Sequence, residues 1–245
     1  MGIFADFLIS LTNFFGGNLG TTIIFIGVFS RLIFHPFLKT SLRQTKVLQE
    51  LRPKLDEAKK KHGHDRKRHA EEQAKIYREA GFNPLAGCLA PIIQLVVAIV
   101  LFNAISNVVK SGLNTSFLIW DLAQPDTFKG TFGVEGFWGQ LPGVLVILTA
   151  VATLLQSKMM LPEPVKPEKQ DSKKEMEKKQ DLASALTASQ GQFVFLFPFL
   201  ILFTGRLFPS GLALFWLVST VVGLFQQYYI VGLGGLNQWL KILKR

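Results

Sequence analysis

The chain has 245 residues, of which 49% are hydrophobic, and it carries a formal net charge of +10. A mean hydropathy of +0.30 and 22 phenylalanines make the chain too apolar for an ordinary soluble domain. The single cysteine, Cys88, excludes an internal disulfide. So many apolar residues and so much charge are compatible only if the charges are segregated along the sequence, which favours a membrane protein.

The N-terminal segment predicts a short helix at a membrane surface. Residues 1–15 alternate apolar clusters with Asp6, Ser10 and Asn13 at helical spacing. This pattern is typical of an amphipathic helix that lies in the membrane interface. The segment lacks the basic region that opens a signal peptide, so we expect no cleavage here.

Long runs without charge predict membrane-spanning helices. About 20 apolar residues cross a bilayer as a helix, and four charge-free runs reach that length. An opening stretch that contains Arg31 supplies a fifth candidate. We therefore predict an all-α polytopic membrane protein with five transmembrane helices, at 19–39, 83–109, 137–159, 187–205 and 208–233.

The basic residues between these runs predict the orientation. Residues 39–79 contain 13 Lys or Arg against 7 Asp or Glu, whereas residues 110–135 contain two Lys against three acids. Because positive loops stay in the cytoplasm, we expect the N-terminus outside and the C-terminus inside. The intervening segments are then an extracytoplasmic loop at 110–136, a flexible cytoplasmic linker at 160–186 and a basic cytoplasmic tail at 234–245.

The basic segment 40–80 predicts a cytoplasmic helical hairpin. Leu48, Leu51, Leu55 and Ala58 share one helical face, and the pattern breaks at "HGHD" before it resumes. The apolar stripe is thin, so we expect a mobile hairpin. We also expect Pro53 to kink or end the first helix.

The sequence argues against an enzyme. Four histidines are present, at positions 35, 62, 64 and 69, but three of them lie in a solvated, strongly cationic turn that would oppose a metal ion. No nucleotide-binding, hydrolase or metalloprotease motif occurs, and no acid lies in any predicted span. We therefore expect no catalytic residue, no metal and no cofactor.

Polar residues inside the predicted spans are the candidate site. Arg31 lies 12 residues after Leu19, about 18 Å along a helix and slightly beyond the middle of a ~30 Å apolar layer. It either reaches the headgroups along its own side chain or faces a wet recess. Polar partners for such a recess, or for ordinary interhelical hydrogen bonds, are Gln94, Asn103, Gln156 and Gln226. With no acid to neutralise it, Arg31 in a recess would attract acidic segments.

Three separated stretches resemble the YidC/Oxa/Alb family of membrane protein insertases. They are "GVFSRLIFHPFLK" at 27–39, "GFNPLAGCLAPIIQ" at 81–94 and "LFPSGLALFWLVSTVVGLFQQYYI" at 207–230. The resemblance implies a hydrophilic groove, with Arg31 as its cation and Gln156 and Trp216 as further contacts. It also aligns Gln94 with a motif glutamine. This chain departs from the family pattern where Leu95 follows Gln94 in place of proline.

The resemblance implies an insertase and chaperone in the bacterial inner (plasma) membrane. Nascent membrane proteins and membrane lipids are the expected partners, and no DNA is expected. The Sec translocon, the ribosome and the signal recognition particle receptor are further candidates. Two alternatives stay open: a small channel or transporter, and a scaffold that docks partners through the basic hairpin.

Overall fold

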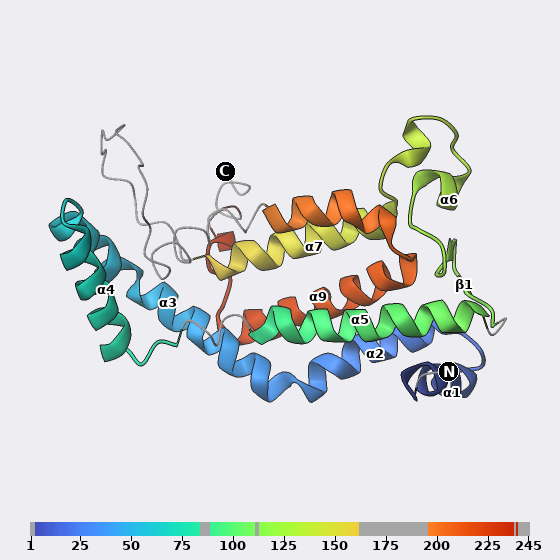
Figure 1. The fold of residues 1–245 in the computed structure, drawn as a ribbon, viewed down its shortest axis with the longest axis horizontal. Coiled ribbons are helices and arrows are strands. Elements are labelled where there is room, and N and C mark those ends of the chain that lie inside the picture. Colours follow the sequence, from blue (N-terminus) through green and yellow to red (C-terminus); the bar gives the residue numbers. More distant parts are fainter. Residues whose placement is uncertain (1–2, 84–88, 111–112, 162–195, 238, 240–245) are drawn as a thin grey trace.

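The computed structural model describes residues 3–83, 89–110, 113–161, 196–237 and 239. These residues are mainly helical, as the sequence predicts (Figure 1). One small sheet pairs β1 (Ser116–Phe117) with β2 (Trp120–Asp121) in antiparallel fashion. The helices are α1 (Ile3–Phe14), α2 (Leu19–Ile33), α3 (His35–His62), α4 (Arg66–Glu79), α5 (Leu89–Lys110), α6 (Phe128–Phe132), α7 (Val144–Met160), Leu196–Leu207 and α9 (Ser210–Ile230). The predicted linker at 160–186 and most of the predicted tail lie outside the described residues.

Helices α2, α5, α7 and α9 run along the long axis of the molecule, and α1 lies across one end (Figure 1). The main apolar core joins α2, α5 and α9, with Ile23, Ile105 and Phe215 almost fully buried. On its other side α9 packs against α7, where Thr149 Oγ1 donates a hydrogen bond to the carbonyl of Ala213 at 3.2 Å. Helix α9 is therefore the central helix of the bundle.

Length and composition alone identify few spans in the described residues. Helix α9 is long and apolar enough to cross a membrane. Helices α1 and α2 are long and apolar enough only when taken together, and a bend of 113° separates them. The other apolar helices are shorter, at Ile92–Val108, Val144–Met160 and Leu196–Leu207. The count of five spans therefore stays a prediction.

The predicted span 19–39 contains a helix boundary. Helix α2 ends at Ile33, and α3 begins at His35 with Pro36 in its first turn. A proline is tolerated there because the first N–H groups of a helix have no intrahelical partner. Helix α3 then continues through Pro53 to His62, so this proline does not end the helix as the sequence suggested it could.

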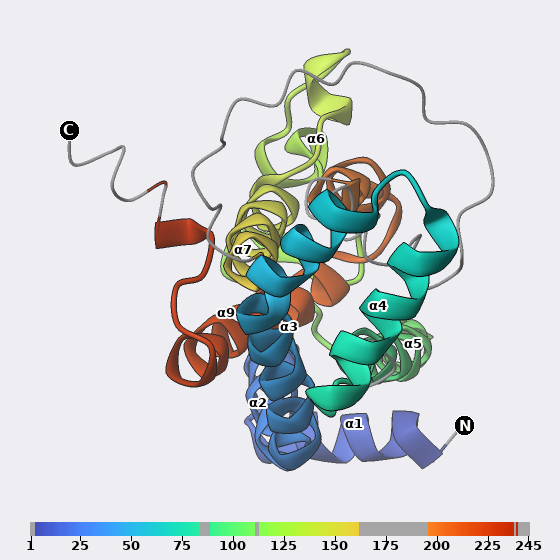
Figure 2. The same ribbon diagram turned by 90° about the vertical axis from the view of Figure 1, so that its left-hand side faces the viewer.

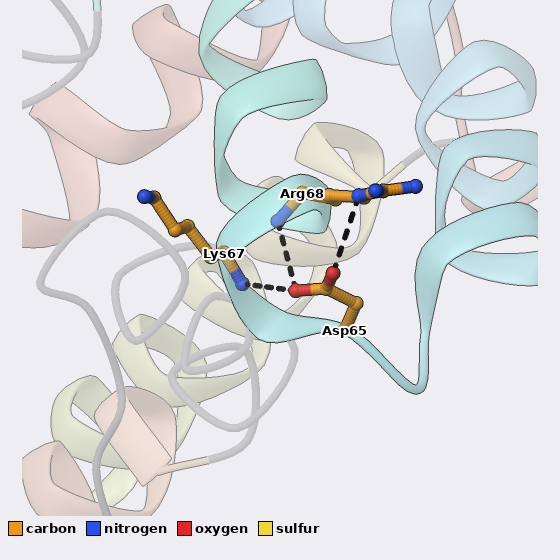
Figure 3. A network of polar contacts seen from close by, with 3 residues as sticks. All are labelled: Asp65, Lys67 and Arg68. Carbon is orange, nitrogen blue, oxygen red and sulfur yellow. Dashed lines mark hydrogen bonds and ion pairs between the residues drawn. The ribbon is translucent and has the colours of Figure 1, made fainter.

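Helices α3 and α4 project from one end of the bundle and contact each other (Figures 1 and 2). The Asp65 carboxylate caps α4 by accepting hydrogen bonds from the backbone N–H groups of Lys67 and Arg68, at 3.1 and 3.2 Å (Figure 3). Arg68 also pairs with Asp65 at 3.4 Å. Few apolar side chains of this pair are buried, Leu51 and Ala58 among them, which matches the thin stripe in the sequence.

At the opposite end, the segment between α5 and α7 packs over the first turns of α7 and α9 (Figure 1). The buried Asp126 carboxylate accepts hydrogen bonds from the N–H of Val146 at 2.9 Å and from Trp120 Nε1 at 3.1 Å. The N–H of Ser210, in the first turn of α9, donates to the carbonyl of Gln124 at 2.7 Å. Loop groups thereby satisfy N–H donors that a helix start leaves free.

Candidate functional site

Arg31 lies in the last turn of α2 and directs its guanidinium group toward α9 and α7. A Cβ placed on Gly223 of α9 would lie 3.0 Å from Arg31 Cζ and 2.5 Å from Gln156 Nε2. The guanidinium group and the Gln156 amide therefore meet at the surface of α9, where a larger residue in place of Gly223 would have to push their side-chain ends aside. The structure thus brings together two of the residues that the sequence singled out, from α2 and α7.

The Arg31 guanidinium group has no acidic partner in the part of the chain that the structure describes. No Asp or Glu oxygen of these residues lies within 4.0 Å of it. Its Nε atom is buried without a hydrogen-bond acceptor among the described residues. An arginine that is partly buried and unneutralised attracts negative charge more strongly than one in water, because the surrounding dielectric is lower.

Two glutamines of α9 connect the neighbouring helices around this arginine. Gln226 Nε2 donates to the carbonyl of Arg31 at 3.2 Å and lies 3.1 Å from His35 Nδ1, so it bridges the boundary between α2 and α3. Gln227 Nε2 donates to the carbonyl of Gln156 at 3.3 Å. Gln226 therefore fixes the backbone that carries Arg31, rather than lining a recess with its amide alone.

A small cavity lies beside Arg31. It is lined by polar and apolar side chains of four helices, including Gln94 of α5 and Phe215 of α9. Its volume of about 10 Å³ is close to the least that holds one water molecule. Gln94 Nε2 is buried with no hydrogen-bond partner in the described part of the chain, so the cavity has a free donor. The hydrophilic groove that the family resemblance implies stays a prediction.

Asn103 and Trp216 lie away from this cluster. Asn103 is exposed on α5, and its carbonyl accepts a hydrogen bond from Asn107 Nδ2 at 2.8 Å. Trp216 packs against the small apolar cluster of Val146, Ala150 and Ile201, and its ring lies 5.8 Å from that of Phe197 between centroids. Among the candidate residues, the described structure thus gathers Arg31, Gln94, Gln156 and Gln226 and leaves these two outside.

Sequence reasoning did not single out Gly223, the residue of α9 against which the Arg31 guanidinium group and the Gln156 amide pack. Ser219 lies one turn earlier on α9, is fully buried and has no hydrogen-bond partner among the described residues for its hydroxyl. A glycine inside an otherwise regular helix was the available signal, since such a residue often marks a close approach. No group of three or more potential metal ligands occurs in the described ranges.

Comparisons with known proteins agree on one family. The family model "60Kd inner membrane protein" matches residues 10–233. A "Membrane protein insertase YidC" of Fusobacterium nucleatum is 28% identical over 94% of this chain and 95% of its own length. A relative of the same name from Alkalihalophilus pseudofirmus is 27% identical over 91% of this chain and 77% of its own length. Another, from Magnetococcus marinus, is 30% identical over 93% of this chain and 35% of its own length.

A solved structure supports the same assignment. The crystal structure of an active YidC insertase with its first transmembrane domain resolved superposes with a TM-score of 0.58 at 27% identity. The alignment covers 92% of this chain and 44% of that one. The chain therefore spans less than half of that protein, although it spans nearly all of the Fusobacterium relative. By the family model and by the resemblance of its sequence, this chain belongs to the 60Kd inner membrane protein (YidC/Oxa/Alb) family, whose members are insertases and not enzymes.

Proposed function

We propose that the chain is a membrane protein insertase that moves hydrophobic segments of nascent proteins from the cytoplasm into the bilayer, past the cation of Arg31. The names of its relatives support the insertase activity. The observation that carries the role of Arg31 is its guanidinium group, which is packed against Gly223 and Gln156 with no acidic partner among the described residues. Such a cation can hold an acidic tail transiently.

The energy for insertion would come from the substrate. Each apolar side chain that leaves water for lipid contributes a favourable transfer free energy, roughly 0.3–0.6 kcal/mol for leucine-like residues at the helix centre. The tail beyond that helix is polar and must be held until the helix has entered lipid. Arg31 would lower the cost of this step by attracting carboxylates in a region of low dielectric. No nucleotide or cofactor is needed.

The proposed setting is the bacterial inner membrane, with the N-terminus outside and the C-terminus in the cytoplasm. Helices α3 and α4 then lie on the cytoplasmic side, where their many cations can meet partners. Nascent membrane proteins are the substrates. The Sec translocon, the ribosome and the signal recognition particle receptor are the candidate partners of the basic α3–α4 pair.

The test is insertion of a single-span substrate with an acidic N-terminal tail into vesicles that contain the purified chain. Arg31→Ala should lower insertion about tenfold, the effect of losing one charge-assisted contact. Arg31→Lys should retain most of the activity, because the acidic tail is attracted by the positive charge and does not need the bidentate hydrogen bonds that only a guanidinium group can make. Wild-type insertion by Arg31→Ala at equal abundance would refute the role of Arg31.

A matched control is available in Arg206, an exposed arginine outside the site that donates to the carbonyl of Gln140 at 3.0 Å. Arg206→Ala should insert the same substrate at the wild-type rate. A channel is the competing function, and the roughly 10 Å³ cavity beside Arg31 does not favour it. Ion flux through vesicles that hold the wild-type chain would favour the channel over the insertase.

A further inference from the structure

A second, larger recess lies between the start of α3 and the end of α9. It has a volume of about 610 Å³, within the range of small-molecule sites. Lys39, Arg43 and Lys46 line one wall, together with Glu50. These positions follow one another at helical spacing, so they share one face of α3. The recess thus presents three cations and one acid to a ligand.

The three cations are available to a ligand. All three side chains are exposed, and none forms an ion pair with a carboxylate in the described residues. Three positive charges along about 10 Å of helix repel one another, so an anion bound between them relieves this repulsion. The single carboxylate of Glu50 lies at the far end of the row.

The opposite wall is apolar and continues along α9. Tyr229 and Ile230 line the recess, and Tyr229 is 83% exposed. Phe225, one turn earlier on the same face, is 63% exposed, and Val221, another turn earlier, is 38% exposed. An exposed apolar stripe therefore leads along α9 into a basic recess. A tyrosine at the meeting point of an apolar and a polar surface is typical of a membrane boundary.

We propose that this recess binds the headgroup of an anionic phospholipid, with the phosphate on Lys39, Arg43 and Lys46 and an acyl chain along Val221, Phe225 and Tyr229. The proposal rests on the membrane setting given under the proposed function. A phospholipid uses both walls at once, because its charged headgroup fits the cations and its acyl chain can follow the apolar stripe from Tyr229 to Val221. Cations beside a membrane surface each add attraction to anionic lipid.

The experiment is a lipid titration of the full-length chain in neutral detergent, followed by native mass spectrometry. Phosphatidylglycerol and phosphatidylcholine with the same acyl chains serve as probes. Wild type should bind phosphatidylglycerol on the order of tenfold more tightly. The combined variant Lys39→Gln, Arg43→Gln, Lys46→Gln should lose this preference, while Phe225→Ala should weaken binding of both lipids.

The matched control removes three cations from the other end of α3. The combined variant Lys54→Gln, Lys59→Gln, Lys61→Gln has the same net charge as the first, and these exposed side chains lie outside the recess. It should keep the full preference. An equal loss in both variants would overturn the site, because the effect would then follow net charge.

Two competitors separate the possible ligands. Excess glycerol phosphate should leave bound phosphatidylglycerol in place, because it cannot use the apolar wall; complete displacement would overturn the lipid proposal. An RNA oligonucleotide that binds the recess while wild type shows no lipid preference would also overturn it. The titration contains no substrate, so its outcome is independent of the insertion test with Arg31→Ala.

Discussion

Among the residues that the structure describes, Arg31 is positioned by packing and by its backbone, and no carboxylate pairs with it. Its carbonyl accepts a hydrogen bond from Gln226, and its guanidinium group lies against Gly223 beside the Gln156 amide. Neither contact supplies negative charge. The positive charge therefore stays available, and one nearby carboxylate should be enough to cancel it.

Gln156→Glu supplies that carboxylate with almost no change in shape. The new acid would lie beside the guanidinium group and compete with a substrate's acidic tail. We expect insertion of an acidic-tailed substrate to fall about tenfold, as for Arg31→Ala. A substrate with a neutral tail should be inserted as by wild type. Parallel insertion assays with both substrates measure the difference.

Gln156→Leu is the control for this prediction, since it removes the amide without adding charge. It should keep most of the insertion of the acidic-tailed substrate. Combining Arg31→Ala with Gln156→Glu should lower insertion of the acidic-tailed substrate further than Arg31→Ala alone, because the new carboxylate then has no cation beside it and repels the tail. Normal insertion by Gln156→Glu, at equal protein abundance, would show that the free charge of Arg31 is not used.

The sequence predicts which polar residues lie within the spans and at what depth in the membrane. It does not predict for all of them which face of the helix they occupy. Asn103 follows Gln94 by nine positions, which is about half a turn beyond two full turns of a helix, so the two residues lie on opposite faces of α5. Gln94 lines the cavity and Asn103 is exposed. Trp216 was named through the family resemblance alone. The role of Gly223 depends on how closely α2 and α7 approach α9, which a local pattern does not contain.

At the scale of elements, the hydrophobic pattern of the sequence predicts where helices occur but not the residues at which they begin and end. The boundary after Ile33 lies inside an apolar stretch, and Pro36 is its only local signal. Asp126 lies in a loop outside the predicted spans, where the sequence pattern gives no sign that its carboxylate is buried. That residue is 1% exposed and joins the loop to α7.

Asp126→Asn tests how firmly this loop is held. The buried carboxylate accepts hydrogen bonds from Val146, Trp120 and Thr131, and an amide would turn an N–H₂ group toward one of these donors. An unsatisfied buried group costs about 1–3 kcal/mol. We expect the melting temperature in detergent to fall by roughly 3–10 °C, measured by the fluorescence of the tryptophans.

Glu135→Gln is the matched control on the same loop. Glu135 pairs with Lys129 at 3.1 Å, but both side chains are mostly exposed, so solvent screens the pair. Its melting temperature should stay close to that of wild type. If Asp126→Asn melts no earlier than Glu135→Gln, the carboxylate does not hold the loop on α7.

On the scale of the whole molecule, the charges are segregated in space as they are in sequence. The strongly basic α3–α4 pair projects from one end, and the segment between α5 and α7, with two lysines and three acids over residues 110–135, packs at the other (Figure 1). A protein with one basic end and apolar helices between the ends is expected to cross the membrane with the basic end in the cytoplasm. This orientation can be tested at two exposed positions.

Single cysteines placed in a Cys88→Ser background report the side of each end. Phe137→Cys lies in the loop before α7, where the native side chain is 73% exposed, and Lys61→Cys lies on exposed α3. A membrane-impermeant maleimide should label position 137 in intact cells and position 61 only after the membrane is opened. The reverse pattern would put the basic helices outside, away from any nascent chain in the cytoplasm, and the proposed path of insertion past Arg31 would then fail with it.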